Sequence, residues 1–141
     1  MDLWENRGPA YGLNGTLYTA ELYASRAVEI IKTHNKSQPL FLYLAFQMTH
    51  TPLDPPKSFL RPSLYPQDKT SQRLAFNAMA LLLDGGVANV TAALRAEGMW
   101  DSTLLLATAD NGAWIVGKSG IKGGANGGGS NYPVCTNHPY D

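Results

Sequence analysis

The chain has 141 residues, about the size of one average domain, and 44% of them are hydrophobic, which is enough to build a core. Its 11 basic and 11 acidic residues cancel, so no global field attracts nucleic acid or an anionic membrane, and we expect no nucleic-acid partner. The first residues contain no basic and apolar leader, and no apolar run has the length of a membrane span, so we expect no membrane-spanning segment.

Residues 17–34 have the pattern of an amphipathic helix. Small and apolar side chains recur there at intervals of three and four residues, which places them on one helical face. This predicted face consists of Ala20, Ala24, Ala27, Val28 and Ile31. We expect the helix to stop within residues 35–39, because Pro39 biases the preceding residue away from the helical region.

A continuous apolar run follows at residues 39–47, "PLFLYLAFQ". A run that is apolar on both faces is typical of a buried strand in a parallel sheet. The strand is expected to end at "MTHTPLDPP", where Pro52, Pro55 and Pro56 enforce a loop. His50 and Thr51 therefore lie at its carboxyl end.

Residues 53–69 are rich in proline and have no clear period, so we expect an ordered surface loop. A second helical pattern begins at about Ser71 and ends at Gly98, a natural C-terminal stop. Gly85 and Gly86 interrupt it and favour a kink or close packing. The predicted inner face consists of Phe76, Met79, Leu83, Val87, Val90 and Leu94.

The segment "STLLLATAD", residues 102–110, is the second predicted buried strand. Strand, long helix and strand in this order form a βαβ unit, which implies parallel strands and a right-handed crossover. The predicted fold class is therefore α/β. Ligands in such sheets bind outside the carboxyl ends of the strands, where this chain places His50 with Thr51 and Asp110 with Asn111.

The glycine-rich residues 112–130 begin with Gly112 to Ser119, which spell the phosphate-loop pattern GxxxxGKS. A phosphate loop needs a helix that starts at the Lys-Ser pair and turns its N-terminal dipole toward the phosphates. Here "GIKGGANGGGSNYP" follows, and glycine at every second or third position disfavours a helix. Nucleotide binding is the less favoured hypothesis.

Asp110 and Asn111 support two other interpretations. A carboxylate beside a carboxamide offers hard oxygen ligands that suit Ca²⁺ or Mg²⁺. Asp-Asn-Gly is also a common turn in which these side chains cap the backbone. His50 has the same ambiguity, because a single histidine near a strand end is more often a hydrogen-bonded structural residue than an acid, base or ligand.

Other reactive or modifiable residues give weaker signals. Cys135 is the only cysteine, which excludes an internal disulfide and a CxxC metal clip, and we interpret it as a bystander thiol. Lys118 and Lys122 lie in the glycine-rich segment and are expected to be solvated. Asn-x-Ser/Thr sequons, which accept glycans in a secretory pathway, occur at Asn14, Asn35 and Asn89.

Three blocks of sequence together resemble the sulfatase family, most closely its arylsulfatase B-like branch. They are "KSQPLFLYLAFQMTHTPL", "VANVTAALRAEGMWDSTLLLATADNG" and "GGGSNYP", and they follow one another in the family's order and approximate spacing. The resemblance covers residues 17–133, and residues 134–141 form a divergent tail.

This resemblance implies an alkaline-phosphatase-like α/β fold and calcium-dependent hydrolysis of sulfate esters, often on sulfated sugars. The family's nucleophile is a formylglycine made from a cysteine or serine. By motif, Asp110 and Asn111 correspond to calcium ligands, and His50 to a residue that contacts the sulfate or the leaving oxygen. The resemblance also implies a lysosomal or secreted full-length protein.

The chain departs from the family pattern in three places. It contains no Cys or Ser followed by x-Pro-x-Arg, no early Asp-Asp pair, and no counterpart of the family's downstream active-site lysine. We therefore expect residues 1–141 to be a partial catalytic domain, incomplete and inactive alone, or else a non-catalytic remnant or binding module. A partial sheet would also expose apolar edges, which predicts poor stability or aggregation.

Overall fold

The computed structural model describes residues 3–12, 17–64 and 71–112 of the chain. Two compact units divide it: Met1–Gln47 with Gly85–Asp101, and Met48–Asp84 with Ser102–Asp141. The helix α2, Ser71–Ala96, contributes residues to both units. The other long helix is α1, Thr19–Thr33, which belongs to the first unit.

A short antiparallel hairpin precedes α1. Its strands are β1, Trp4–Glu5, and β2, Gly8–Pro9, with Trp4 opposite Pro9 and Glu5 opposite Gly8. Asn6 in the turn has φ +57°, a left-handed conformation that asparagine tolerates better than most residues. Among the described residues, this two-stranded hairpin is the sheet that forms. The sequence analysis did not predict it.

Both predicted helices form. The four residues of α1 that are buried, Ala20, Ala24, Ala27 and Ile31, belong to the predicted face. On α2 the prediction is only partly right. Met79, Val90 and Leu94 are buried as expected, but Phe76, Leu83 and Val87 are half-buried, so the buried face is rotated from the predicted one. Four positions outside the predicted face are buried as well: Ala78, Leu82, Gly86 and Ala93.

The end of α2 confirms the prediction that Gly98 stops this helix. Gly98 has φ +68°, which lets the chain turn back, and Met99 N–H donates to the Leu94 carbonyl at 2.9 Å. The 3₁₀ helix η3, Trp100–Ser102, follows directly. The Arg95 guanidinium lies 4.3 Å from the centroid of the Trp100 ring, a cation–π contact that ties η3 to the last turn of α2.

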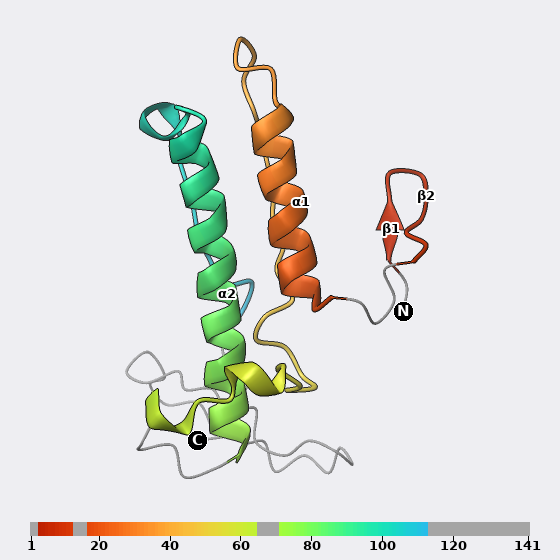
Figure 1. The fold of residues 1–141 in the computed structure, drawn as a ribbon, viewed down its shortest axis with the longest axis vertical. Coiled ribbons are helices and arrows are strands. Elements are labelled where there is room, and N and C mark those ends of the chain that lie inside the picture. The colour runs from red at the N-terminus through yellow and green to blue at the C-terminus, as the bar shows by residue number, and fades with distance from the viewer. Residues whose placement is uncertain (1–2, 13–16, 65–70, 113–141) are drawn as a thin grey trace. The chain divides into compact units, whose positions relative to one another are not determined.

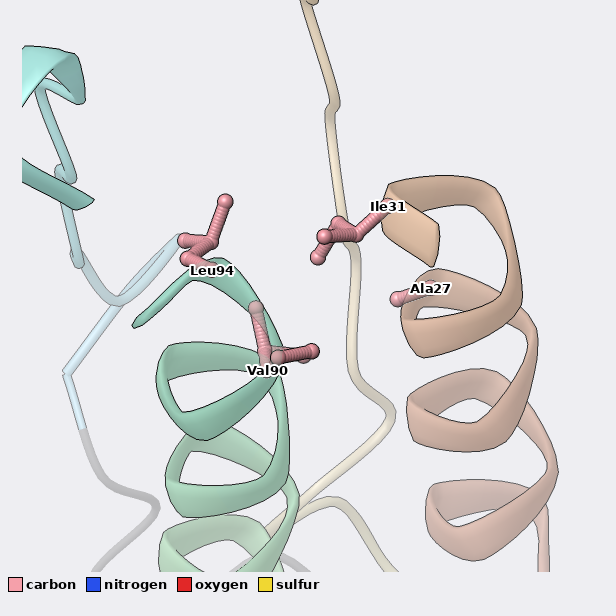
Figure 2. Packing of buried hydrophobic residues seen from close by; sticks show 5 residues of the cluster. Ala27, Ile31, Val90 and Leu94 are labelled. Carbon is pink, nitrogen blue, oxygen red and sulfur yellow. The ribbon is translucent and has the colours of Figure 1, made fainter. Parts of the chain in front are cut away.

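The core of the first unit lies between α1 and the C-terminal half of α2. Figure 2 shows Ala27 and Ile31 of α1 facing Val90 and Leu94 of α2. Lower down, a Cβ on Gly86 would lie 3.6 Å from the Ala24 Cβ, so residue numbers rise along both helices together. The two helices are therefore parallel in this unit, as the ribbon in Figure 1 also shows.

Residues 40–46 run back along these helices as an extended segment. Leu40, Leu42 and Leu44 pack against the core cluster, and the Phe46 ring reaches Gly86. The alternate residues point away, with Phe41 91% and Tyr43 83% exposed. The expectation of a strand buried on both faces is wrong here: no backbone hydrogen bond joins residues 40–46 to another described residue, and one face is open.

Polar contacts fix the edges of the first unit. Arg26 of α1 pairs with Glu29 at 2.6 Å and with Glu5 of β1 at 3.3 Å. The side-chain hydrogen bond to Glu29 raises the pKa of Arg26, so the guanidinium stays charged wherever the protein folds. Lys36, in the turn after α1, forms an ion pair with Glu97 at the end of α2.

The second unit contains the N-terminal half of α2 and the proline-rich segment. Two single-turn 3₁₀ helices form there, η1, Lys57–Phe59, and η2, Pro62–Leu64, so the expected ordered loop is confirmed for the part that the structure describes. Residues 104–109 are extended and exposed, with Leu104 and Leu106 each 83% exposed. The predicted second buried strand is therefore neither buried nor paired among the described residues.

One helix among the described residues is long and apolar enough, by length and composition alone, to cross a membrane. It comprises Gln72–Ala96 of α2. Single helices of this kind are weak evidence, because the core helix of a soluble domain meets the same criteria. Asp84 lies at the middle of the 25 residues, where a carboxylate would cost about 2.5–3.5 kcal/mol in a bilayer. The packing of Val90 and Leu94 on α1 fits a core helix.

Candidate functional site

The candidate site residues all belong to the second unit and follow the two extended apolar segments along the chain. His50 comes three residues after Gln47, and Asp110 and Asn111 come directly after residues 104–109. All three side chains are exposed. Exposure is compatible with a binding role, because a ligand must reach these groups.

His50 lies in a tightly turned segment. The peptide bonds Met48–Thr49 and Thr51–Pro52 on either side of it are both cis. The His50 Nδ1 atom lies 2.6 Å from the Thr51 carbonyl oxygen. A carbonyl can only accept, so this contact assigns the proton to Nδ1 and leaves Nε2 as the ring atom available to a ligand. Thr51 thus orients the imidazole, a role that the sequence pattern did not indicate.

Asp110 and Asn111 form a local turn. The Asn111 backbone N–H donates to Asp110 Oδ1 at 2.8 Å, and Asn111 Nδ2 donates to the Gly112 carbonyl at 2.9 Å. The second bond uses the amide nitrogen and therefore turns Asn111 Oδ1 away from the backbone. Both interpretations of Asp-Asn-Gly are compatible with this geometry: the side chains cap a turn, and they still present carboxylate and amide oxygens.

The donor set fits a hard cation by type but is incomplete in number. Asp110 Oδ2 and Asn111 Oδ1 are the oxygen ligands that Ca²⁺ accepts, and Ca²⁺ takes about six to eight of them. Within the described ranges, no group of three or more His, Cys, Asp or Glu side chains is gathered in a way that could hold a metal ion. Neither a hydrogen bond nor an ion pair joins His50 to Asp110 or Asn111 among these residues.

Several predicted features lie outside the described residues. They are the phosphate-loop pattern beyond Gly112, the lysines at 118 and 122, Cys135, the "GGGSNYP" block and the sequon at Asn14. The structure therefore describes His50 and the candidate metal ligands Asp110 and Asn111, and the interpretation of the glycine-rich segment stays a prediction.

Comparison with known proteins gives a consistent result over most of the chain. The model of the family described as Sulfatase matches residues 2–138. Arylsulfatase J of Mus musculus is 32% identical over 133 residues, which are 94% of this chain and 20% of that protein. The uncharacterized sulfatase YdeN of Escherichia coli is 33% identical, with 97% of this chain and 24% of that protein aligned.

A third relative carries a more specific name. N-acetylgalactosamine-6-sulfatase of Rattus norvegicus is 31% identical over 114 residues, which are 80% of this chain. The alignment covers 20% of that protein. The chain therefore spans about a fifth to a quarter of the length of the curated relatives described here.

Proposed function

Because this chain belongs to the sulfatase family, we propose that it forms part of a domain that hydrolyses sulfate esters. The single observation that supports this most strongly is the family match over residues 2–138. Within it, we assign Asp110 and Asn111 as calcium ligands and His50 as the residue that contacts the sulfate or the leaving oxygen. The family's alkaline-phosphatase-like α/β fold would bring these two turns to one edge of a parallel sheet.

The assignment of Asp110 and Asn111 rests on their oxygen donors. One Asp110 oxygen holds the turn through the Asn111 N–H, and the remaining oxygen and the Asn111 amide oxygen are available to a cation. A bound Ca²⁺ would supply positive charge beside the sulfate oxygens, where charge develops during ester cleavage. This chain would contribute two of the ligands, and the others would come from elsewhere in the domain.

The assignment of His50 implies a particular protonation state. With Nδ1 donating to the Thr51 carbonyl, Nε2 can contact an anionic oxygen favourably only when it also carries a proton. His50 would therefore act as an imidazolium, donating from Nε2 to a sulfate oxygen or to the leaving oxygen.

The nucleophile is not assigned to any residue of this sequence. Cys135 is followed by Thr-Asn-His, and no Cys or Ser in the 141 residues precedes x-Pro-x-Arg. We propose that residues 1–141 bind the cation and the anion without turning over the ester by themselves. The substrate class that we propose is a sulfated carbohydrate, supported by the relative whose name specifies a sulfated amino sugar.

Calcium titration of the 141-residue chain, followed by isothermal calorimetry, tests the metal assignment. We expect weak binding, with a Kd on the order of 10⁻⁴ to 10⁻³ M, because few ligands are contributed. Asp110→Ala should abolish the binding. The matched control is Asp101→Ala, which removes an exposed carboxylate of η3 and should leave the Kd unchanged.

Equal loss in both variants would show only a diffuse effect of charge, and the assignment of Asp110 would then be wrong. Undetectable binding to the unmodified chain, despite a cooperative thermal transition, would overturn the proposal that residues 1–141 bind calcium by themselves. Inorganic sulfate titrated against the chain and its His50→Ala variant tests the anion contact in the same way. Binding that is independent of His50 would contradict that assignment.

A further inference from the structure

The turn that follows α1 carries a sequon in an unusually well-defined geometry. Asn35-Lys36-Ser37 is an Asn-x-Ser triplet, and all three residues are exposed. Asn35 Oδ1 accepts two hydrogen bonds from Ser37, one from its backbone N–H at 3.1 Å and one from its hydroxyl at 2.9 Å. These bonds engage the amide oxygen with the third residue of the sequon.

The consequence for Asn35 is geometric. A carboxamide whose oxygen accepts two hydrogen bonds within the turn presents its nitrogen outward. Asn35 Nδ2 is therefore the atom that an approaching electrophile meets first.

The rest of the turn is held by its surroundings. Gln38 N–H donates to the Asn35 carbonyl at 3.0 Å, and the His34 Nε2 atom lies 2.8 Å from the Gln38 carbonyl oxygen. The ion pair between Lys36 and Glu97 ties the middle of the triplet to the end of α2. Asn35 is exposed and is not a member of the core cluster, so an attached group would project into solvent.

The other described sequon, Asn89-Val90-Thr91, has a different arrangement. It lies inside α2, where the middle residue, Val90, is buried in the core. The Thr91 hydroxyl donates to the Ala88 carbonyl at 3.0 Å and does not reach the Asn89 amide oxygen. Only the Asn35 sequon thus combines exposure with a closed Asn–Ser turn among the described residues.

We propose that Asn35 is an N-glycosylation site. The proposal rests on membership of a sulfate-ester hydrolase, as in the proposed function, and on the lysosomal or secreted destination that the family resemblance implies. The donor is a lipid-linked diphosphate oligosaccharide: Asn35 Nδ2 forms a bond to the anomeric carbon of the sugar, the carbon–oxygen bond to the diphosphate breaks, and the lipid diphosphate leaves with the electron pair. The amide nitrogen loses one proton in this step.

The test is secretion of the full chain from mammalian cells behind a signal peptide, with a C-terminal Asn-x-Thr tag as an internal acceptor. Digestion with an amide-cleaving glycosidase and gel mobility count the glycans. Asn35→Gln and Ser37→Ala should each remove one mobility step, and Ser37→Thr should retain it. Asn14→Gln and Asn89→Gln serve as matched sequon controls and report on those positions separately.

A glycosylated tag with no mobility step that depends on both Asn35 and Ser37 would overturn the proposal. Loss of the step in Ser37→Thr would also contradict it, because threonine preserves the sequon and the hydroxyl. Calcium binding by the chain is measured independently of these outcomes. Failure of the glycan assignment and failure of the proposed metal site are therefore distinguishable.

Discussion

Two apolar segments of this chain have similar compositions and very different surroundings. Residues 40–46 place alternate leucines on the helices of the first unit, whereas residues 104–109 are exposed throughout in the second unit. Neither segment pairs its backbone with another described residue. Both apolar runs are extended, and burial requires in addition a surface that offers complementary side chains at a spacing of two residues.

The core that receives the first segment should be the most sensitive part of the molecule. Ile31 is 1% exposed and contacts the cluster of both helices, so Ile31→Ala should lower the free energy of unfolding by about 2–5 kcal/mol. The matched variant, Leu106→Ala, truncates a residue that is 83% exposed and should change it by less than about 0.5 kcal/mol. Chemical denaturation of both variants measures the difference. Equal effects would show that the second segment is as well packed as the first.

The close approach of the first segment to α2 can be tested at two neighbouring glycines. A Cβ on Gly86 would lie 3.0 Å from the Phe46 Cζ atom, whereas a Cβ on Gly85 would meet nothing within 4 Å. Gly85→Ala should stabilise the protein by about 0.5–1 kcal/mol through helix propensity. Gly86→Ala should be less stable than Gly85→Ala by about 1–3 kcal/mol, because the Phe46 ring must move. Thermal unfolding of the two variants measures this difference in stability. Equal stabilities would mean that Phe46 does not pack closely against α2 at Gly86.

The smallest effect is expected at the turn that leads into the first segment. The Lys36–Glu97 ion pair is partly exposed, so Lys36→Gln should cost no more than about 1 kcal/mol, and less at high salt. The control is Lys57→Gln, which removes an exposed lysine of η1. A double-mutant cycle with Glu97→Gln, measured by denaturation at two salt concentrations, isolates the pair. A coupling that does not change with salt would contradict a solvent-exposed ion pair.

Local patterns predicted the helices well. The three-and-four spacing of Ala20, Ala24, Ala27 and Ile31 and the stop before Pro39 gave α1 to within two residues at its start and one at its end. Gly98 marked the end of α2 for a physical reason, its left-handed φ. These features depend on neighbours in sequence, which is why the sequence contains them.

The extended segments were predicted less completely. A strand needs a backbone partner from elsewhere in the chain, and neither the apolar run at 40–46 nor that at 104–109 identifies one. The inner face of α2 was misjudged for a related reason: large residues were expected inward, whereas Gly86 and Ala93 lie there because α1 and Phe46 come close.

The site was predictable as a set of residue types rather than as a geometry. The family blocks pointed to His50, Asp110 and Asn111, and these assignments stay predictions. The Thr51 carbonyl decides which ring nitrogen of His50 is available to a ligand. Two backbone contacts decide which oxygens of Asp110 and Asn111 remain available to a cation. Such contacts follow from turn conformation, which residue spacing does not specify.

The stripe of alanines on α1 has an evolutionary consequence. Ala20, Ala24 and Ala27 are each 2% exposed, and Ala24 lies against the position where Gly86 has no side chain. No larger residue fits there unless a neighbour shrinks in the same step. During evolution, substitutions on this face of α1 should therefore be limited to the smallest side chains or be accompanied by a compensating substitution in a neighbour. Substitutions of the exposed residues Glu21 and Ser25 should be tolerated more widely.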